Sequence, residues 1–133
     1  SYRYRYSSVR HHPLPTTYAA MTTATPANAA AASTAASAFV GTYSDPINHP
    51  GGTRTVQLLD GQVVGDFQLA EVVGGGGVGE PKSFVLPAVV LGNRTIIIDF
   101  SPKGGPKDFT GVLDGKDIKF LKDGNRWPRV EEQ

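Results

Sequence analysis

Short alternating apolar runs, separated by turn-forming residues, occupy residues 39–130 and restrict the possible fold more than any other feature. Eight runs fit β-strands, at 39–44, 53–59, 62–73, 83–91, 94–100, 108–113, 116–121 and 125–130. Asp-Gly pairs stand at 60–61, 114–115 and 123–124. Asp-Gly between alternating runs is a strong hairpin signal, because both residues tolerate the positive φ of tight turns.

Strands joined in this simple order predict an all-β fold, an antiparallel meander of about eight strands that closes into a small barrel or curved sandwich. Closure removes the exposed strand edges that would otherwise pair with other chains. The alternation predicts inward positions for Val56, Leu58, Val63, Phe67, Leu69, Ile96, Ile98, Phe100, Phe109, Leu113, Ile118 and Phe120. It places Gln68 outside. Trp127, the only tryptophan, is predicted to close one end of the core, with a place in a ligand pocket as the alternative.

Residues 1–36 have a different composition, rich in Ala, Thr, Ser, Pro and Tyr, with neither strand nor helix periodicity. Such a segment cannot bury enough apolar surface to offset an ordering cost of about 1–2 kcal/mol per residue. We therefore predict an extended low-complexity N-terminal arm over 1–36 and a β-domain over 37–133, with a short helix near 29–38 as the alternative. The arm is rich in arginine and poor in acids, which is typical of an organelle transit peptide.

Composition argues against several classes of protein. The formal net charge is +1, whereas nucleic-acid binding needs a concentrated basic surface. The chain has no cysteine, so disulfides and cysteine metal sites are excluded. No apolar run approaches the roughly 20 residues that span a bilayer, so we expect no transmembrane segment in this sequence.

Two loops carry most of the candidate polar chemistry. Lys103 and Lys107 flank two glycines between strands; they could form an anion nest, but a phosphate loop would continue into a helix. A rigid basic turn that docks on an acidic neighbour is the favoured interpretation. Asp45 and His49 lie in the first loop, and one His with one Asp falls short of a metal site.

Catalysis is not indicated anywhere in the β-domain, which shows no serine–histidine–acid set, paired-carboxylate signature or metal cluster. The glycine run at 74–79 lies between two strands, whereas a dinucleotide loop precedes a helix. We interpret it as a flexible loop. The sequence therefore predicts a protein that is not an enzyme, with no cofactor and no metal.

Three strings, "FVGTYSDPINHPGG", "IIIDFSPKGGPKDFTGV" and "DGNRW", span residues 39–127. They resemble a family of small β-domain proteins from algae and other plastid-bearing organisms. The resemblance implies a plastid setting and carries over no catalytic residues.

We therefore expect a non-catalytic accessory subunit of a large assembly, plausibly a photosystem or antenna complex, in the chloroplast on the lumenal or stromal face of the thylakoid. Tyr and Arg are enriched at interface cores. The predicted partner-binding residues are Tyr2, Arg3, Tyr4, Arg5, Tyr6, Arg10, Asp45, His49, Lys103 and Lys107.

The alternative is a barrel that carries a small apolar ligand such as a lipid, pigment or quinone. Small residues at Gly65, Ala88 and Gly111 could leave room inside an eight-stranded barrel. The inward phenylalanines argue for a filled interior.

Overall fold

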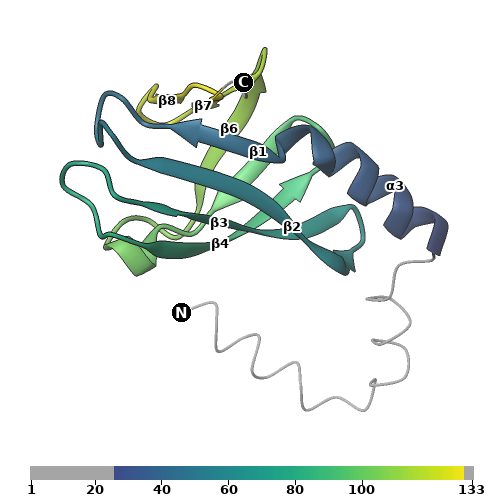
Figure 1. The fold of residues 1–133 in the computed structure, drawn as a ribbon. Helices are drawn as coiled ribbons and strands as arrows, with labels where there is room; N and C mark the ends of the chain where they lie inside the picture. Colours follow the sequence, from purple (N-terminus) through teal and green to yellow (C-terminus); the bar gives the residue numbers. More distant parts are fainter. Residues whose placement is uncertain (1–25, 131–133) are drawn as a thin grey trace.

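The computed structural model describes residues 26–130, with side chains from residue 30 onward, and it forms one eight-stranded sheet in sequence order (Figure 1). The strands are β1 (Gly41–Ser44), β2 (Thr53–Val64), β3 (Phe67–Gly75), β4 (Phe84–Leu91), β5 (Thr95–Ile98), β6 (Phe109–Asp114), β7 (Asp117–Phe120) and β8 (Arg126–Trp127). Every neighbouring pair is antiparallel, so the predicted meander is confirmed. None of the helices in residues 26–130 has the length and apolar character to cross a membrane.

The sheet curls until its first strand meets the residues after its last strand. Tyr43 and Arg129 form an antiparallel bridge. The amide of Ser44 donates to the carbonyl of Pro128 at 2.9 Å, and the amide of Val130 donates to the carbonyl of Thr42 at 2.8 Å. These contacts bring the meander nearly to closure as a small barrel, one of the two forms that the sequence predicted.

The Arg129 side chain connects the closure of the sheet to strand β1 and to the residues just before it. Its guanidinium lies 4.8 Å from the centroid of the Tyr43 ring and donates to the carbonyls of Val40, at 2.8 Å, and Ala38, at 2.9 Å. A Cβ at Gly41 would lie 2.5 Å from Nη1 of Arg129, so a larger residue there would displace the guanidinium. Burial raises the pKa of Tyr43 to about 12, even though the nearby Arg129 charge lowers it.

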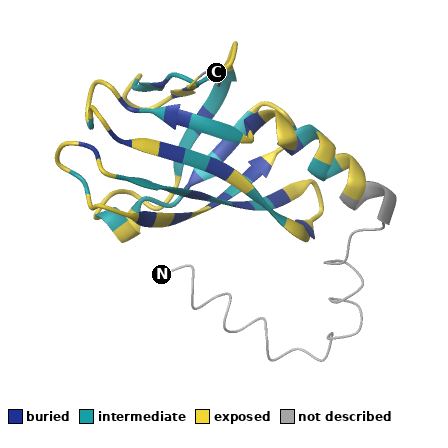
Figure 2. Ribbon diagram, viewed as in Figure 1, coloured by how far each residue is buried: buried dark blue, intermediate teal, exposed yellow. Residues whose placement is uncertain are grey.

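The barrel interior is filled by the alternate apolar side chains, as the banding along the strands in Figure 2 shows. Val56, Ile96, Ile98 and Ile118 are fully buried, which confirms their predicted inward positions. Trp127 is 2% exposed and belongs to the same core cluster. The prediction that this tryptophan closes the core is therefore correct.

The hairpin between β2 and β3 differs from the prediction. The chain turns at Gly65-Asp66, not at Asp60-Gly61, because β2 continues to Val64, which pairs with Phe67. Between the pairs Leu58–Ala70 and Val63–Gln68 the register shifts, so four residues of β2, at 59–62, lie opposite Leu69 alone.

The turn at Gly65-Asp66 reverses the predicted faces of β3, because the inward Val63 pairs with Gln68, and paired residues lie on the same face of a sheet. Phe67 is 40% exposed, whereas Gln68 is fully buried. The Gln68 amide group donates to the carbonyls of Leu59, at 2.7 Å, and Leu69, at 2.8 Å. A buried amide thus satisfies a backbone carbonyl in the bulged segment.

The N-terminal segment is helical where the structure describes it. Helix α3 (Pro26–Ala36) runs into the 3-10 helix η1 (Ser37–Phe39) and packs against β2, β3 and β4 beside the β2–β3 hairpin (Figure 1). Ser33 donates to the Oε1 atom of Gln68 at 2.6 Å, and Ala36 is fully buried. The extended arm predicted over 1–36 therefore does not include 26–36, where the alternative of a short helix is the better description. Residues 1–25 lie outside the described residues.

The packing of α3 predicts that a chain starting at residue 37 melts at a lower temperature than a chain starting at residue 26. Loss of the Ser33–Gln68 hydrogen bond and of the buried Ala36 should remove about 1–2 kcal/mol of unfolding free energy. That corresponds to a Tm lower by about 5–10 °C in thermal denaturation. In the longer chain, Ser33→Ala should give part of this loss and the exposed neighbour Thr34→Ala almost none. Equal melting of the two truncated chains would contradict the packing role of α3.

Candidate functional site

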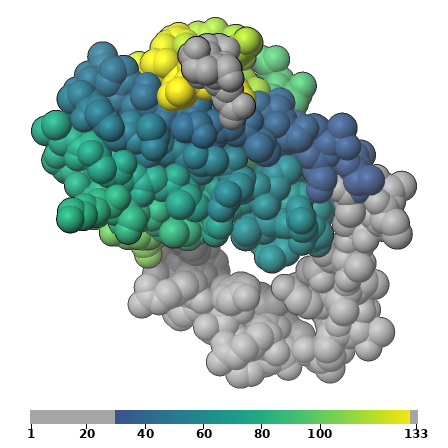
Figure 3. All heavy atoms as spheres, viewed as in Figure 1, coloured from purple at the N-terminus to yellow at the C-terminus, as the bar shows by residue number. Residues whose placement is uncertain are grey.

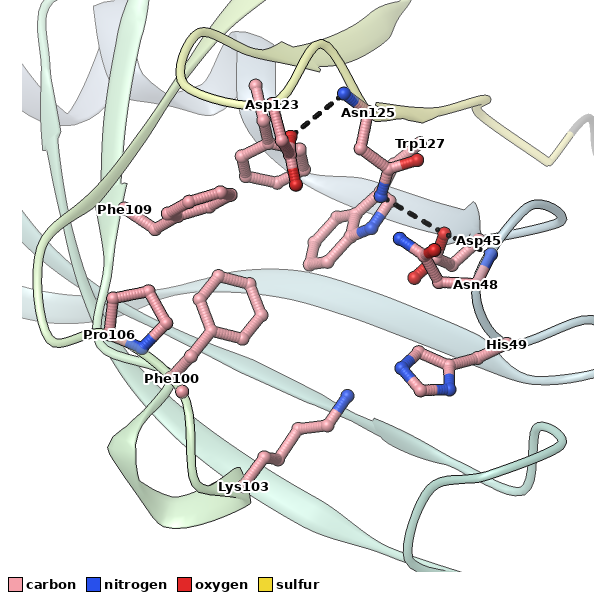
Figure 4. Close-up of a pocket in the computed structure, with 12 residues that line it drawn as sticks. Asp45, Asn48, His49, Phe100, Lys103, Pro106, Phe109, Asp123, Asn125 and Trp127 are labelled. Atoms are coloured by element: carbon pink, nitrogen blue, oxygen red, sulfur yellow. Dashed lines mark hydrogen bonds between the residues drawn. The ribbon is translucent and has the colours of Figure 1, made fainter.

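A pocket opens at the end of the barrel opposite the β2–β3 hairpin. Four loops meet there, namely β1–β2, β3–β4, β5–β6 and β7–β8, because alternate connections of an up-and-down meander lie at the same end. The pocket has a volume of about 240 Å³ (Figure 4). Its lining residues are Asp45, Asn48, His49, Phe100, Lys103, Gly105, Pro106, Phe109, Phe120, Asp123, Asn125 and Trp127.

Four aromatic side chains form the apolar wall of the pocket. Phe120 and Trp127 meet edge to face at a centroid distance of 4.8 Å, and Phe109 lies 5.4 Å from Phe120. Phe100 stands nearly perpendicular to Phe109 at 5.7 Å and lies 6.0 Å from Trp127. Edge-to-face aromatic pairs add about 0.5–1.5 kcal/mol each beyond their area burial, so this wall is held in a defined arrangement.

The β1–β2 loop supplies one polar side of the pocket. Asp45 is 4% exposed and accepts hydrogen bonds from the amide of Asn48 and from Nδ2 of Asn125, the latter at 3.2 Å. The Nδ1 atom of His49 lies 2.8 Å from the carbonyl oxygen of Val78. Because a carbonyl oxygen only accepts, Nδ1 carries the proton in the neutral ring. Nε2 of His49 is then an acceptor, and it points into the pocket (Figure 4).

The second polar contribution is Lys103, at the end of the 3-10 helix η2 (Ser101–Lys103). Its ammonium donates to Oε1 of Glu80 at 2.9 Å and lies 4.3 Å from the centroid of the Phe84 ring. The Glu80 side chain is fully buried, and the Lys103 side chain is 11% exposed. Lys103 is therefore folded toward the barrel, with its amine at the pocket (Figure 4).

Arg54 is the second cation bound to Glu80 and is fully buried. Its guanidinium lies 5.0 Å from the Trp127 ring centroid and 5.5 Å from that of Phe84, so it is enclosed by aromatic side chains. The Nη1 atom is 3.9 Å from a carboxylate oxygen of Asp45. An arginine in this position replaces the apolar residue that the alternation of β2 would otherwise place inside the barrel.

Three buried polar atoms of this region have no hydrogen-bond partner within residues 26–130, namely Nε and Nη1 of Arg54 and Oδ1 of Asn125. A buried polar group without a partner costs about 1–3 kcal/mol. Asn125 lines the pocket, and Asp45 contacts both Asn125 and Arg54. The buried polar atoms without partners therefore lie on one side of the site.

Glu80 is held in its charged form. Burial raises the pKa of this carboxyl, but hydrogen bonds from Lys103 and Arg54, the Arg54 charge and the Gly77 amide together hold it below its ordinary value. The Gly77 amide donates to Oε2 at 3.0 Å. Each carboxylate oxygen is thus bound by a donor on a different element of the barrel.

The glycine run between β3 and β4 allows this close packing. A Cβ at Gly77 would lie 2.5 Å from the carbonyl oxygen of His49, and one at Gly52 would lie 2.3 Å from Oε2 of Glu80. The amide of Val78 donates to the carbonyl of Pro50 at 3.0 Å. The β1–β2 and β3–β4 loops therefore lie against each other (Figure 3), and the glycines at 52 and 77 allow this close approach.

The structure brings together three of the predicted partner-binding residues, because Asp45, His49 and Lys103 all line the pocket. Lys103 is not the exposed docking residue expected from the sequence, since Glu80 binds it. Lys107 is exposed and lies outside the pocket lining. The six remaining residues, Tyr2, Arg3, Tyr4, Arg5, Tyr6 and Arg10, lie outside the described residues.

Sequence reasoning missed Arg54, Glu80 and Asn125. Arg54 gave a usable signal, because it shares the inward face of β2 with Val56 and Leu58, where a charge needs a partner. Glu80 gave none, since its pairing with Arg54 joins positions 26 residues apart.

Within the described residues, no group of three or more His, Cys, Asp and Glu side chains could hold a metal ion. Comparison of the chain with models of known protein families, with curated protein sequences and with solved structures finds no match. The functional argument therefore rests on the geometry of the pocket.

Glu80→Gln should lower the unfolding free energy at pH 7 by about 3 kcal/mol, because it leaves two buried cations without their carboxylate. Glu71→Gln, which changes a half-buried carboxylate bonded to Gln57, should cost less than about 0.5 kcal/mol. Urea denaturation of the two variants measures the difference, and equal small losses would contradict the role of Glu80.

The stability of the wild type and that of Glu80→Gln should respond differently to acid. Because the folded chain lowers the pKa of Glu80, its stabilisation is present above the unfolded pKa and disappears as the pH falls through the folded pKa. Between about pH 5 and pH 3 the wild type should therefore lose more stability than Glu80→Gln.

Proposed function

We propose that this protein is a non-catalytic binding module that holds a small, mostly apolar ring compound in the pocket at the open end of its barrel. The observation that carries the proposal is the wall of four aromatic rings, Phe100, Phe109, Phe120 and Trp127, with polar groups opposite it. Ligand pockets are typically apolar and aromatic, with a few polar groups that fix the orientation of the ligand.

The volume of the pocket limits the size of the ligand. Its volume of about 240 Å³ is below the roughly 300–1,000 Å³ of most ligand sites. A compound of one or two rings, such as a quinone headgroup, fits this volume better than an enclosed acyl chain or a pigment macrocycle. Of the ligands considered from the sequence, a quinone-sized ring is therefore the best supported.

Binding is favoured over catalysis by the way the polar residues are held. His49 is oriented by the Val78 carbonyl, Asp45 by amide groups, and Lys103 is neutralised by Glu80. In nucleophilic catalysis a nucleophile and its base usually lie within hydrogen-bond reach of each other, and the described lining of this pocket contains no serine, threonine or cysteine. The residues here instead form a fixed polar surface against which a ligand can be positioned.

Naphthalene is a suitable probe, because Trp127 provides a single indole N–H signal for NMR titration. Saturable binding is expected, and Phe100→Ala should weaken it about tenfold by removing one ring of the wall. Phe67→Ala is the matched control, since Phe67 lies on the outer face of β3 and is 40% exposed. An unchanged indole N–H signal of Trp127, or equal affinities of Phe100→Ala and Phe67→Ala for naphthalene, would contradict the proposal.

The second candidate function is that of an accessory subunit of a photosynthetic complex in the chloroplast, associated with the thylakoid. It is favoured by the apolar outer face of β4, where Val85 is 53% exposed and Leu91 is 41% exposed beside its cross-strand partner Phe67. Contiguous exposed apolar side chains often mark a surface that contacts another protein. The plastid resemblance and the Tyr-Arg pattern of residues 2–6 add to this proposal.

Native gel electrophoresis of solubilised thylakoid membranes tests this second function. The full chain should migrate with a photosystem or antenna complex, and a chain starting at residue 26 should bind more weakly because it lacks the tyrosines and arginines. The shorter chain keeps α3 and its packing on the barrel, so weaker binding would not result from loss of this helix. Migration of the full chain as a free monomer would contradict this function.

A further inference from the structure

We infer that the ligand of this pocket is an uncharged planar ring compound that carries a hydrogen-bond acceptor facing Lys103 and a donor facing His49. The inference rests on the proposed ligand-binding function and specifies the chemistry of that same site. It follows from the donors and acceptors at the pocket and from their charge balance.

The donor on the protein side is the ammonium of Lys103. It has three N–H bonds, and its hydrogen bond to Glu80 uses one of them. The ammonium also lies 4.3 Å from the centroid of the Phe84 ring, and Figure 4 shows it at the pocket, where its remaining N–H bonds can meet an acceptor. An acceptor oxygen on a ring held against Phe100 can therefore receive a charge-assisted hydrogen bond.

The acceptor on the protein side is His49. The Nδ1 proton of His49 is directed to the Val78 carbonyl, which leaves Nε2 as an acceptor toward the pocket. Oδ1 of Asn125 has no hydrogen-bond partner within residues 26–130, but this atom is buried and is not open to a ligand. A donor group on the ligand is thus matched by Nε2 of His49, on the side of the pocket away from Phe109.

The buried and largely buried charges around the site already balance, and Asp123, which also lines the pocket, is exposed to solvent. Arg54 and Lys103 carry two positive charges, and Glu80 and Asp45 carry two negative ones. An anionic ligand would add an uncompensated charge near Asp45, whereas a cationic ligand would add one near Lys103. Burying an unpaired charge is strongly unfavourable, so an uncharged ligand is preferred.

Four two-ring probes of similar size separate these chemistries. The first is 2-quinolone, which has a carbonyl oxygen beside an N–H. Naphthalene lacks polar atoms, 2-naphthoate is an anion, and N-methylquinolinium is a cation. Titration of the full chain, followed by the Trp127 indole resonance, should give an affinity for 2-quinolone at least about tenfold above each of the others.

Lys103→Met tests the donor directly, since methionine keeps an unbranched side chain without the amine. This variant should lose about tenfold more affinity for 2-quinolone than for naphthalene. Lys107→Met in the same loop is the matched control, because Lys107 is exposed and outside the pocket lining. If Lys103→Met does not fold, the comparison of the four probes on the wild type decides the matter.

The outcomes distinguish this inference from the proposed function. Equal affinity for all four probes would leave a ligand-binding pocket and overturn the predicted ligand chemistry. Tightest binding of 2-naphthoate or of N-methylquinolinium would overturn it as well, in favour of a charged ligand. No binding of any probe would overturn both proposals.

Discussion

The guanidinium of Arg54 lies inside the barrel, between the rings of Trp127 and Phe84, and the open end of the molecule is arranged around it. A buried charge of this kind persists only with a bound partner. Glu80 is that partner, and its carboxylate also receives Lys103 from η2 and the amide of Gly77. One carboxylate therefore fixes the β3–β4 loop, the β5–β6 loop and strand β2 relative to one another.

The two ends of the barrel are built differently as a result. At the β2–β3 end, α3 covers the sheet, and Gln68 hydrogen-bonds both Ser33 and the Leu59 carbonyl in the bulged segment. At the other end, the charge network turns Lys103 inward and leaves a pocket between the aromatic wall and the β1–β2 loop. A barrel closed by Arg129 along its seam is thus covered at one end and hollowed at the other.

The strands of this fold could be predicted because their alternation and turn residues are local signals. The β2–β3 hairpin is the exception, because Asp60-Gly61 is a pair typical of tight turns but lies in a bulge of β2. There the packing of α3 and the hydrogen bonds of the buried Gln68 outweigh the local preference of Asp60-Gly61 for a tight turn. The pocket was harder to predict, since the inward fold of Lys103 depends on Glu80, 23 residues away, and on a buried arginine that neither loop reveals.

The central claim is that the buried charge network holds a polar and aromatic pocket ready for a neutral ring. A crystal structure of the full chain grown with 2-quinolone tests it most directly. The account predicts the ring against Phe100 and Trp127, with its carbonyl oxygen within hydrogen-bond distance of Nζ of Lys103. A ring bound elsewhere on the barrel, or a Lys103 side chain turned out to solvent with Glu80 unpaired, would contradict the account.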